Sequence, residues 1–257
     1  MTEATLRSLV AQAGLGEASV ILLPLDGAGP PFELEPDRPL MPASMIKVPV
    51  AAALAHRWSA GELRPSDRVV VDPANLTAND AASPLVAGYE ATLEELGRLM
   101  LTRSDNVATN VLIDVLDREP INRFCRRARL TGTAVRRKLS GSLPLIDDPR
   151  ATGRNAHPAG DAARLFAQVA ARGREDWLYS TLANQEWNDK LSRGLQPGDR
   201  FAHKTGDTDE VSHDGGILEL AGGGRFVLVV YAPLPSSSEV DARHAAFMRA
   251  LRPMLER

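Results

Sequence analysis

Ser44 and Lys47 lie three positions apart in the segment PASMIKVPV, residues 42–50. A helix that begins near Ser44 would place both side chains on one face, with the lysine amine within reach of the serine oxygen. A serine hydroxyl is a weak nucleophile that needs a neighbouring base, and a desolvated lysine can serve as that base. The pair therefore predicts a nucleophile with its base, although a serine at a helix start and a lysine whose head reaches water would leave the same pattern.

Two further short motifs follow along the chain, S-D-N at residues 104–106 and K-T-G at residues 204–206. The three motifs S-x-x-K, S-D-N and K-T-G, in this order, resemble the signature of penicillin-recognising serine enzymes. The chain thus resembles the class A β-lactamase-like family, which includes relatives of the penicillin-binding proteins. The separations between motifs, 60 residues and then 100 residues, are similar to those of the family, and the resemblance covers nearly the whole chain.

The resemblance implies roles for the residues of the first two motifs. Ser44 would attack a carbonyl carbon and become acylated, while Lys47 would take or relay its proton. Ser104 would pass a proton toward the leaving nitrogen, with Lys204 beside it. Asn106 would hold the side-chain amide of the substrate.

The same resemblance implies roles around the K-T-G motif. Lys204 and Thr205 would bind the carboxylate of the substrate, and Gly206 lets the substrate approach the strand backbone closely. The backbone N–H groups of Ser44 and Asp207 would form the oxyanion hole. An acyl-transfer site needs such a set, namely a nucleophile, a base, an electrostatic anchor and donors aimed at the developing oxyanion.

Asp207 departs from the family pattern, because its carboxylate puts negative charge where the negative charge of a substrate is expected. We expect Asp207 either to pair with Lys204 or to favour a substrate with a cationic or neutral group there. An exposed aspartate at the end of a strand is the alternative.

A second departure is an absence in residues 136–165, which contain no glutamate. Class A β-lactamases carry an E-x-x-L-N loop in this region, and its glutamate activates the water that releases the acyl group. The carboxylates present here are Asp147, Asp148 and Asp161. We expect Asp161 to help begin the following helix. Asp147 and Asp148 precede a proline and fit a solvated turn, but one of them could replace the glutamate with a shorter side chain.

Composition narrows the possible partners. The 257 residues are 44% apolar and 25% charged, which is typical of a soluble globular protein. A net charge of −3 does not favour nucleic acid or an anionic membrane as a partner, and we expect neither a metal nor a cofactor.

The N-terminus has no signal-peptide pattern, so the sequence as written predicts a cytoplasmic protein, or a periplasmic or secreted one if a leader was removed. The oligomeric state is left open.

Apolar periodicity predicts strands near both chain ends and helices in the middle. Strands are expected at 17–25 and 32–35, with a hairpin formed by 215–222 and 225–233. Helices are expected at the N-terminus, at 92–102, 106–117, 120–130 and 160–172, and from 238 to the C-terminus.

This order predicts an α/β (α+β) fold of the β-lactamase-like type. An antiparallel sheet is built from both chain ends and covered by the terminal helices, and an all-helical domain is inserted into it. The predicted domains are 1–43 with 183–257 for the sheet, and 44–182 for the helices, with the active site between them.

The residues and the resemblance together predict a β-lactamase-like serine hydrolase. It would act through an acyl-serine intermediate on a small-molecule β-lactam, amide or ester, with deacylation in doubt because the loop glutamate is absent. Two alternatives remain open at this point. One is a peptidase or esterase of the same fold, and the other is a protein that binds a lactam or peptide without turning it over.

Overall fold

The structure is a computed structural model that describes residues 2–27, 29–142 and 144–256. The chain forms two compact units: Met1–Met45 with Ala156–Arg257, and Ile46–Asn155. Residues 156–182, which the sequence analysis grouped with the helical domain, thus belong to the first unit. No helix within the described ranges is long and apolar enough to cross a membrane.

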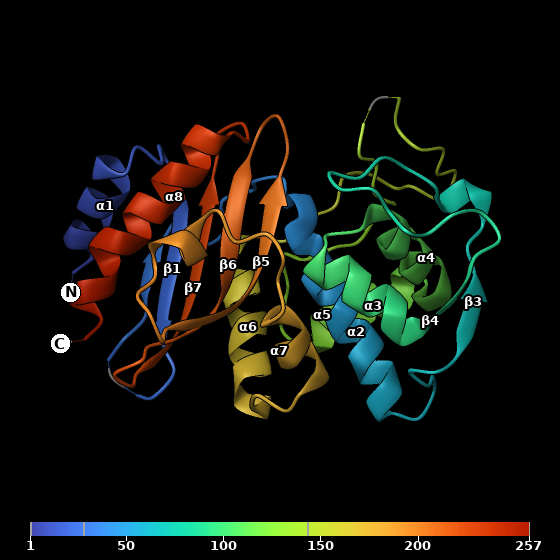
Figure 1. The fold of residues 1–257 in the computed structure, drawn as a ribbon, viewed down its shortest axis with the longest axis horizontal. Coiled ribbons are helices and arrows are strands. Elements are labelled where there is room, and N and C mark those ends of the chain that lie inside the picture. The colour runs from blue at the N-terminus through green and yellow to red at the C-terminus, as the bar shows by residue number, and fades with distance from the viewer. Residues whose placement is uncertain (1, 28, 143, 257) are drawn as a thin grey trace. The chain divides into compact units, whose positions relative to one another are not determined.

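The first unit is built on a five-stranded antiparallel sheet that contains strands from both ends of the chain (Figure 1). This confirms the predicted fold class. The strand order is β2 (Phe32–Leu34), β1 (Ser19–Pro24), β7 (Arg225–Ala232), β6 (Ser212–Glu219) and β5 (Arg200–Asp207).

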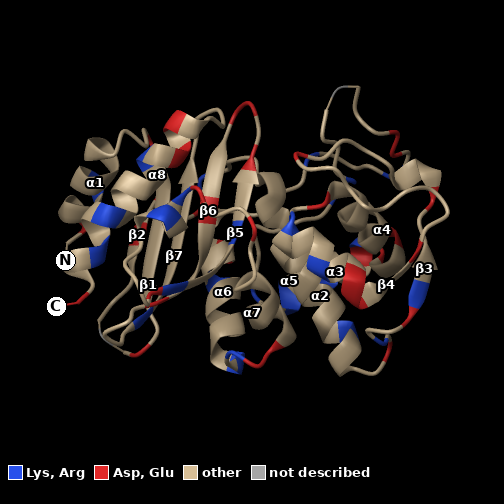
Figure 2. Cartoon of the chain, in the orientation of Figure 1, with Lys and Arg blue, Asp and Glu red and all other residues tan. Residues whose placement is uncertain are grey.

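The central strands are apolar because both faces of the sheet are covered. Figure 2 shows no charged residue in β1 and none in β7 beyond its first position. Side chains alternate between the two faces along a strand, so Leu228 and Val230 join the core beneath α1 and α8, while the odd-numbered residues of β7 face the other side. The run of apolar residues therefore supplies two cores at once.

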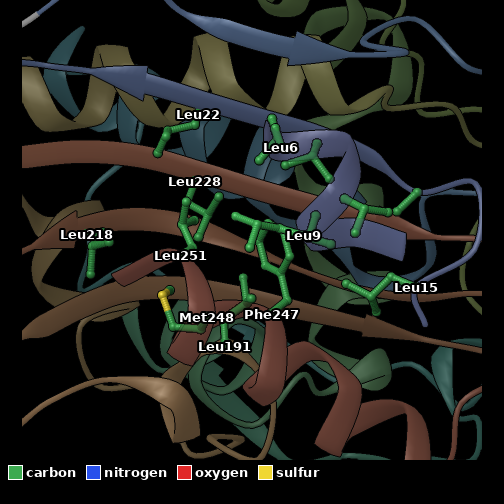
Figure 3. Packing of buried hydrophobic residues seen from close by; sticks show 14 of the residues in the cluster. Leu6, Leu9, Leu15, Leu22, Leu191, Leu218, Leu228, Phe247, Met248 and Leu251 are labelled. Atoms are coloured by element: carbon green, nitrogen blue, oxygen red, sulfur yellow. The ribbon is translucent and has the colours of Figure 1, made fainter. Parts of the chain in front are cut away.

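Helices α1 (Glu3–Gln12) and α8 (Ser238–Leu251) supply the core on one face of the sheet. Figure 3 shows Leu6 and Leu9 of α1 with Phe247 of α8 and Leu228 of the sheet. Each such side chain contributes about 1.5–3 kcal/mol when it is buried. The two chain ends are thereby held on one core.

Helix α6 (Ala159–Arg172) packs against strands β1, β6 and β7, and the short α7 (Trp177–Leu182) packs against β5. Asp161 lies in the first turn of α6, as predicted, where the helix dipole stabilises a carboxylate. It is buried and pairs with Arg164 at 2.7 Å. These contacts with the sheet explain why α6 belongs to the first unit.

The second unit is mainly helical, with α2 (Lys47–Ser59), α3 (Leu93–Thr102), α4 (Asn106–Leu116) and α5 (Arg118–Arg127). Helix α2 contacts the other three helices, and its residues from Lys47 to Leu54 are all buried. Helix α3 has a side-chain cap at its N-terminus, because Thr92 accepts a hydrogen bond from the backbone N–H of Glu95 at 3.1 Å.

This unit also holds a small antiparallel pair, β3 (Arg68–Val70) with β4 (Glu90–Thr92). The sequence analysis did not predict it. Each strand has only three residues, too few to show alternation, and Val70 is largely exposed.

Candidate active site

Lys47 is the first residue of α2, and its side chain is 0% exposed. Its Nζ atom donates hydrogen bonds to the Ser104 carbonyl, to Ser104 Oγ at 3.0 Å and to Asn106 Oδ1 at 2.8 Å. A buried amine needs such acceptors, since leaving it without them would cost the full desolvation penalty. The lysine of the first motif is therefore bonded to the serine and the asparagine of the second.

Ser104 lies at the junction between α3 and α4 in an unusual backbone conformation, with φ of 59°. A positive φ in a residue other than glycine costs on the order of 1–3 kcal/mol, and such strain is concentrated at functional sites. Asp105, the next residue, caps α4 by accepting the N–H of Ala108 at 2.9 Å. The cap holds the start of α4 and so fixes the turn that aims Ser104 at Lys47.

Asn106 is held by the segment 77–79. Its backbone N–H donates to Asn79 Oδ1 at 2.5 Å, and its Nδ2 donates to the Ala78 carbonyl at 2.9 Å. Gly141 packs directly on this segment, since a Cβ atom there would lie 1.9 Å from the Ala78 oxygen. Only glycine fits at position 141 without moving the residues that orient Asn106.

Helix α4 carries a row of polar side chains at intervals of four residues, which places them on one face. Asn106 is the first of them. Asn110 binds both backbone groups of Leu139, accepting its N–H at 2.7 Å and donating to its carbonyl at 2.9 Å. Asp114 pairs with Lys138 at 2.7 Å. The loop after residue 136 is thus held on α4 at Lys138 and Leu139.

Asp148 is occupied by other partners. Its side chain is 3% exposed and accepts two hydrogen bonds from Arg118, at 2.7 and 2.5 Å, and one from the Lys138 backbone N–H at 2.7 Å. Burial raises the pKa of Asp148, but the bonds from Lys138 and Arg118 outweigh it and hold the pKa below its usual 3.8. Asp148 is neither a solvated turn residue nor free to act as a base, whereas Asp147 is exposed beside it.

Ser44 lies in a 3₁₀ turn, Ala43–Ile46, that continues without a break into α2. The boundary between the two units falls within this segment, after Met45. Ala43 has φ of 46°, so a strained residue stands just before the predicted nucleophile as well.

The K-T-G motif lies on β5, the last strand of the sheet. Lys204 and Thr205 are both buried, and Lys204 Nζ donates to the Thr205 carbonyl at 2.9 Å. A Cβ atom on Gly206 would lie 3.2 Å from Ala43 Cβ and from the backbone nitrogen of Met45. The glycine of the third motif therefore allows β5 to approach the segment that carries Ser44.

Asp207 does not pair with Lys204. Its carboxylate lies 2.5 Å from Nζ of Lys190, a residue that the sequence analysis did not consider. Burial raises the pKa of Asp207, but the charge and hydrogen bond of Lys190, together with the side chains of Ser236 and Ser212, lower it overall. Side chains alternate between the two faces of β5, so the Asp207 side chain points away from the face that carries Lys204 and Gly206.

His213 is a further residue that sequence reasoning missed. Its Nε2 atom lies 2.8 Å from the Met41 carbonyl, three residues before Ser44, and its ring stacks on Tyr231 at a centroid distance of 4.1 Å. Burial lowers the pKa of His213 to about 4, so the ring is neutral at pH 7 and Nε2–H is the donor. No local signal could have identified this contact, since 172 residues separate its partners.

The structure thus brings the predicted residues together in two groups. Lys47, Ser104 and Asn106 lie in the second unit, and the residues on either side of Ser44 pack against Gly206 in the first. Within the described residues, no three His, Cys, Asp or Glu side chains are grouped so that they could hold a metal ion.

Comparison with known proteins places the chain in a family. A β-lactamase from Sphaerobacter thermophilus DSM 20745 has a similar structure, with a TM-score of 0.83, 26% identity and 98% of each chain covered. PBP-A, of which a mutant is recorded as an acyl-enzyme complex with penicillin G, has a TM-score of 0.84 over 99% of this chain and 96% of its own. Its identity of 23% shows likeness of fold alone.

A β-lactamase of Rhodobacter capsulatus is 36% identical over 101 residues. That match covers 39% of this chain and only about a third, 34%, of the relative. The model of the beta-lactamase enzyme family, in contrast, matches residues 1–251. The chain therefore belongs to the beta-lactamase enzyme family.

Proposed function

We propose that the protein is a serine acyl-transfer enzyme in which a β-lactam or a related amide or ester acylates Ser44. The observation that carries the proposal is the bonding of buried Lys47 to Ser104 and Asn106. These three residues come from two of the three family motifs, and a base needs such fixed geometry to act on a neighbouring hydroxyl.

In this mechanism Lys47 acts as the neutral amine, which donates two hydrogen bonds instead of three and keeps a lone pair. Ser44 Oγ attacks the carbonyl carbon, and its proton passes to that lone pair. The carbonyl oxygen becomes negatively charged, and the N–H groups of Ser44 and Asp207 stabilise it. Ser104, which shares a hydrogen bond with Lys47, returns a proton to the leaving nitrogen as the C–N bond breaks. The lactam ring opens, and its acyl half stays on Ser44 as an ester.

Substrate binding follows from the remaining motif residues. Lys204 supplies a positive charge for the carboxylate of a penicillin, together with the Thr205 hydroxyl. Asp207 does not cancel that charge, because its own carboxylate is paired with Lys190. This favours an anionic substrate over the cationic or neutral one that an unpaired Asp207 would select. Asn106 would hold the side-chain amide.

Release of the acyl group is the step for which the chain lacks a recognised base. Residues 136–165 contain no glutamate, and Asp148 is bonded to Arg118. A positioned general base is worth roughly 10²–10⁴ in rate. We therefore infer that the penicillin adduct forms faster than it is lost, which favours trapping or slow turnover over efficient β-lactamase activity.

Intact-protein mass spectrometry after mixing with penicillin G tests the proposal. The protein should gain the full mass of the penicillin, and peptide mapping should place the adduct on Ser44. The variant Ser44→Ala should form no adduct, with Cys125→Ala, which removes the single thiol of the chain, as a matched control that still forms it. An adduct that survives Ser44→Ala would refute the assignment of the nucleophile.

The alternatives differ in their products. An esterase or peptidase of this fold would release product steadily from a small ester or peptide while lactams accumulate as the adduct. A binding protein would give at most one equivalent of product with every substrate. Steady-state assays with a chromogenic lactam and a chromogenic ester, run with the same enzyme concentration, separate the three.

A further inference from the structure

Lys190 is a buried lysine that the proposed acyl transfer does not use. It stands just before the short 3₁₀ helix Leu191–Gly194, and its side chain is 5% exposed. Its Nζ atom donates to Asp207 Oδ1 at 2.5 Å and to the His213 carbonyl at 3.2 Å, and lies 3.9 Å from Asp241 Oδ1. One ammonium group therefore joins the end of β5, the start of β6 and the first turn of α8.

The end of β5 needs such support, because β5 is an edge strand that pairs only with β6 in the sheet. Asp207 and Ser212 are the last register pair before the turn at 208–211. Strand ends open locally more easily than strand centres. The predicted oxyanion donor, the N–H of Asp207, stands at this end, so its position depends on what holds the strand there.

The second bond of Lys190 leads toward the nucleophile. His213 lies opposite Gly206 in the register. Lys190 donates to the backbone carbonyl of His213, and the His213 ring donates to the carbonyl of Met41. Gly206 in turn packs against the residues on either side of Ser44. The contacts of Lys190 thus reach both chain segments that are expected to supply the oxyanion donors.

We propose that Lys190 is a positioning residue that fixes the end of β5 relative to the Ser44 segment, through Asp207 and the His213 carbonyl. Stability alone is a weak reason for this ion pair, because a buried pair is often replaced by apolar residues with little loss of stability. The kinetic part of this inference rests on the proposed acylation of Ser44, whereas its structural part does not.

The first unit offers a control in another ion pair, which is more deeply buried than Lys190 with Asp207. Arg252 donates to Asp199 at 2.6 and 2.8 Å, and their side chains are 2% and 0% exposed. Asp199 also accepts the N–H of Ala221, in the turn after β6, so this pair lies at the opposite end of that strand from Ser212. Loss of Arg252 should affect folding without affecting the end of β5.

The experiment compares Lys190→Met with Arg252→Met in the full chain. The rate of Ser44 acylation by penicillin G is measured by intact mass, and amide hydrogen exchange is measured on peptides from β5. We expect Lys190→Met to slow acylation at least tenfold per folded molecule and to speed exchange around residues 204–208 more than around 200–202. Arg252→Met should lower the thermal midpoint yet leave both values unchanged, and Lys190→Arg should recover most of the acylation rate.

The inference is overturned if Lys190→Met slows acylation no more than Arg252→Met does, or if exchange rises evenly along β5. If Lys190→Met does not fold, Asp207→Asn, which nearly keeps the shape but removes the charge, takes its place in both measurements. If the unmodified protein is not acylated at all, the proposed function fails, and the exchange pattern still decides the role of Lys190.

Discussion

Replacing Leu139 with glutamate should speed the release of a trapped acyl group. Leu139 is half-buried, and Asn110 binds both of its backbone groups. Asn110 stands one turn after Asn106 on α4, a rise of about 6 Å, and Asn106 is bonded to Lys47. A carboxylate on position 139 would therefore start from a fixed backbone point about one helical turn from the residues that are expected to carry out acylation.

The expected size of the effect follows from the missing base. A positioned general base is worth roughly 10²–10⁴ in rate, which is about 2.7–5.4 kcal/mol of activation free energy. The exchange leaves the two bonds from Asn110 in place, because they go to the backbone. A substitution at this half-buried position should cost on the order of 1 kcal/mol of stability.

The assay is the decay of the penicillin adduct, followed by intact mass after excess penicillin is removed. Leu139→Glu should shorten the lifetime of the adduct by 10²–10⁴, and Leu139→Gln, of equal size but without a base, should keep the lifetime of the unmodified protein. Thermal melts of both variants establish that they are equally folded.

Two results would refute this reasoning. If the glutamate and glutamine variants release the acyl group equally slowly, position 139 is not close enough to the ester. If the unmodified protein already turns over quickly, another base is present. Asp147→Asn then tests Asp147, which is exposed, unlike its neighbour Asp148.

Three other predictions concern the same unit and its substrate anchor. Lys47→Ala should mainly slow acylation, because it removes the base, whereas Lys204→Ala should mainly weaken the binding of carboxylate-bearing lactams; initial rates over a range of penicillin concentrations separate the two. Gly141→Ala should cost about 1–3 kcal/mol in urea unfolding and slow acylation, since its Cβ would clash with a backbone oxygen 1.9 Å away, while Gly222→Ala, with nothing within 4 Å, should change neither. Asp148→Asn should cost about 3–5 kcal/mol at pH 7 because it leaves a buried guanidinium without its partner. The pKa of Asp148 lies below 3.8 in the folded state, so its contribution is complete above that pH and is lost as the pH falls through the folded value.

The sheet and most helices could be predicted because their sequence patterns are long enough to show a period. The runs that became β1 and β7 are apolar and bounded by turns, and α4 begins within one residue of its predicted start. The β3–β4 pair could not be predicted, since three residues carry no period. The placement of 156–182 with the sheet also needed the structure, because an amphipathic helix does not say which surface its apolar face will cover.

At the site, the family resemblance carried by the motifs pointed to the residues that are bonded within the second unit, Lys47 with Ser104 and Asn106. The partners of the two unusual aspartates could not be found in this way. Asp148 pairs with a residue 30 positions away and Asp207 with one 17 positions away, and neither partner belongs to a motif. A carboxylate next to a motif gives no local sign of the cation that will neutralise it.

Helix α4 explains why we expect Leu139→Glu to alter deacylation without altering acylation. Its first turn holds Lys47 through Asn106, its second turn holds the backbone of Leu139 through Asn110, and its third turn holds Lys138 through Asp114. A helix of fixed rise sets these three contacts about 6 Å apart. Because Asn110 binds only backbone, the side chain at position 139 can change without disturbing Lys47. Leu139→Glu therefore tests for a deacylation base at this position while the contacts of Lys47 stay unchanged.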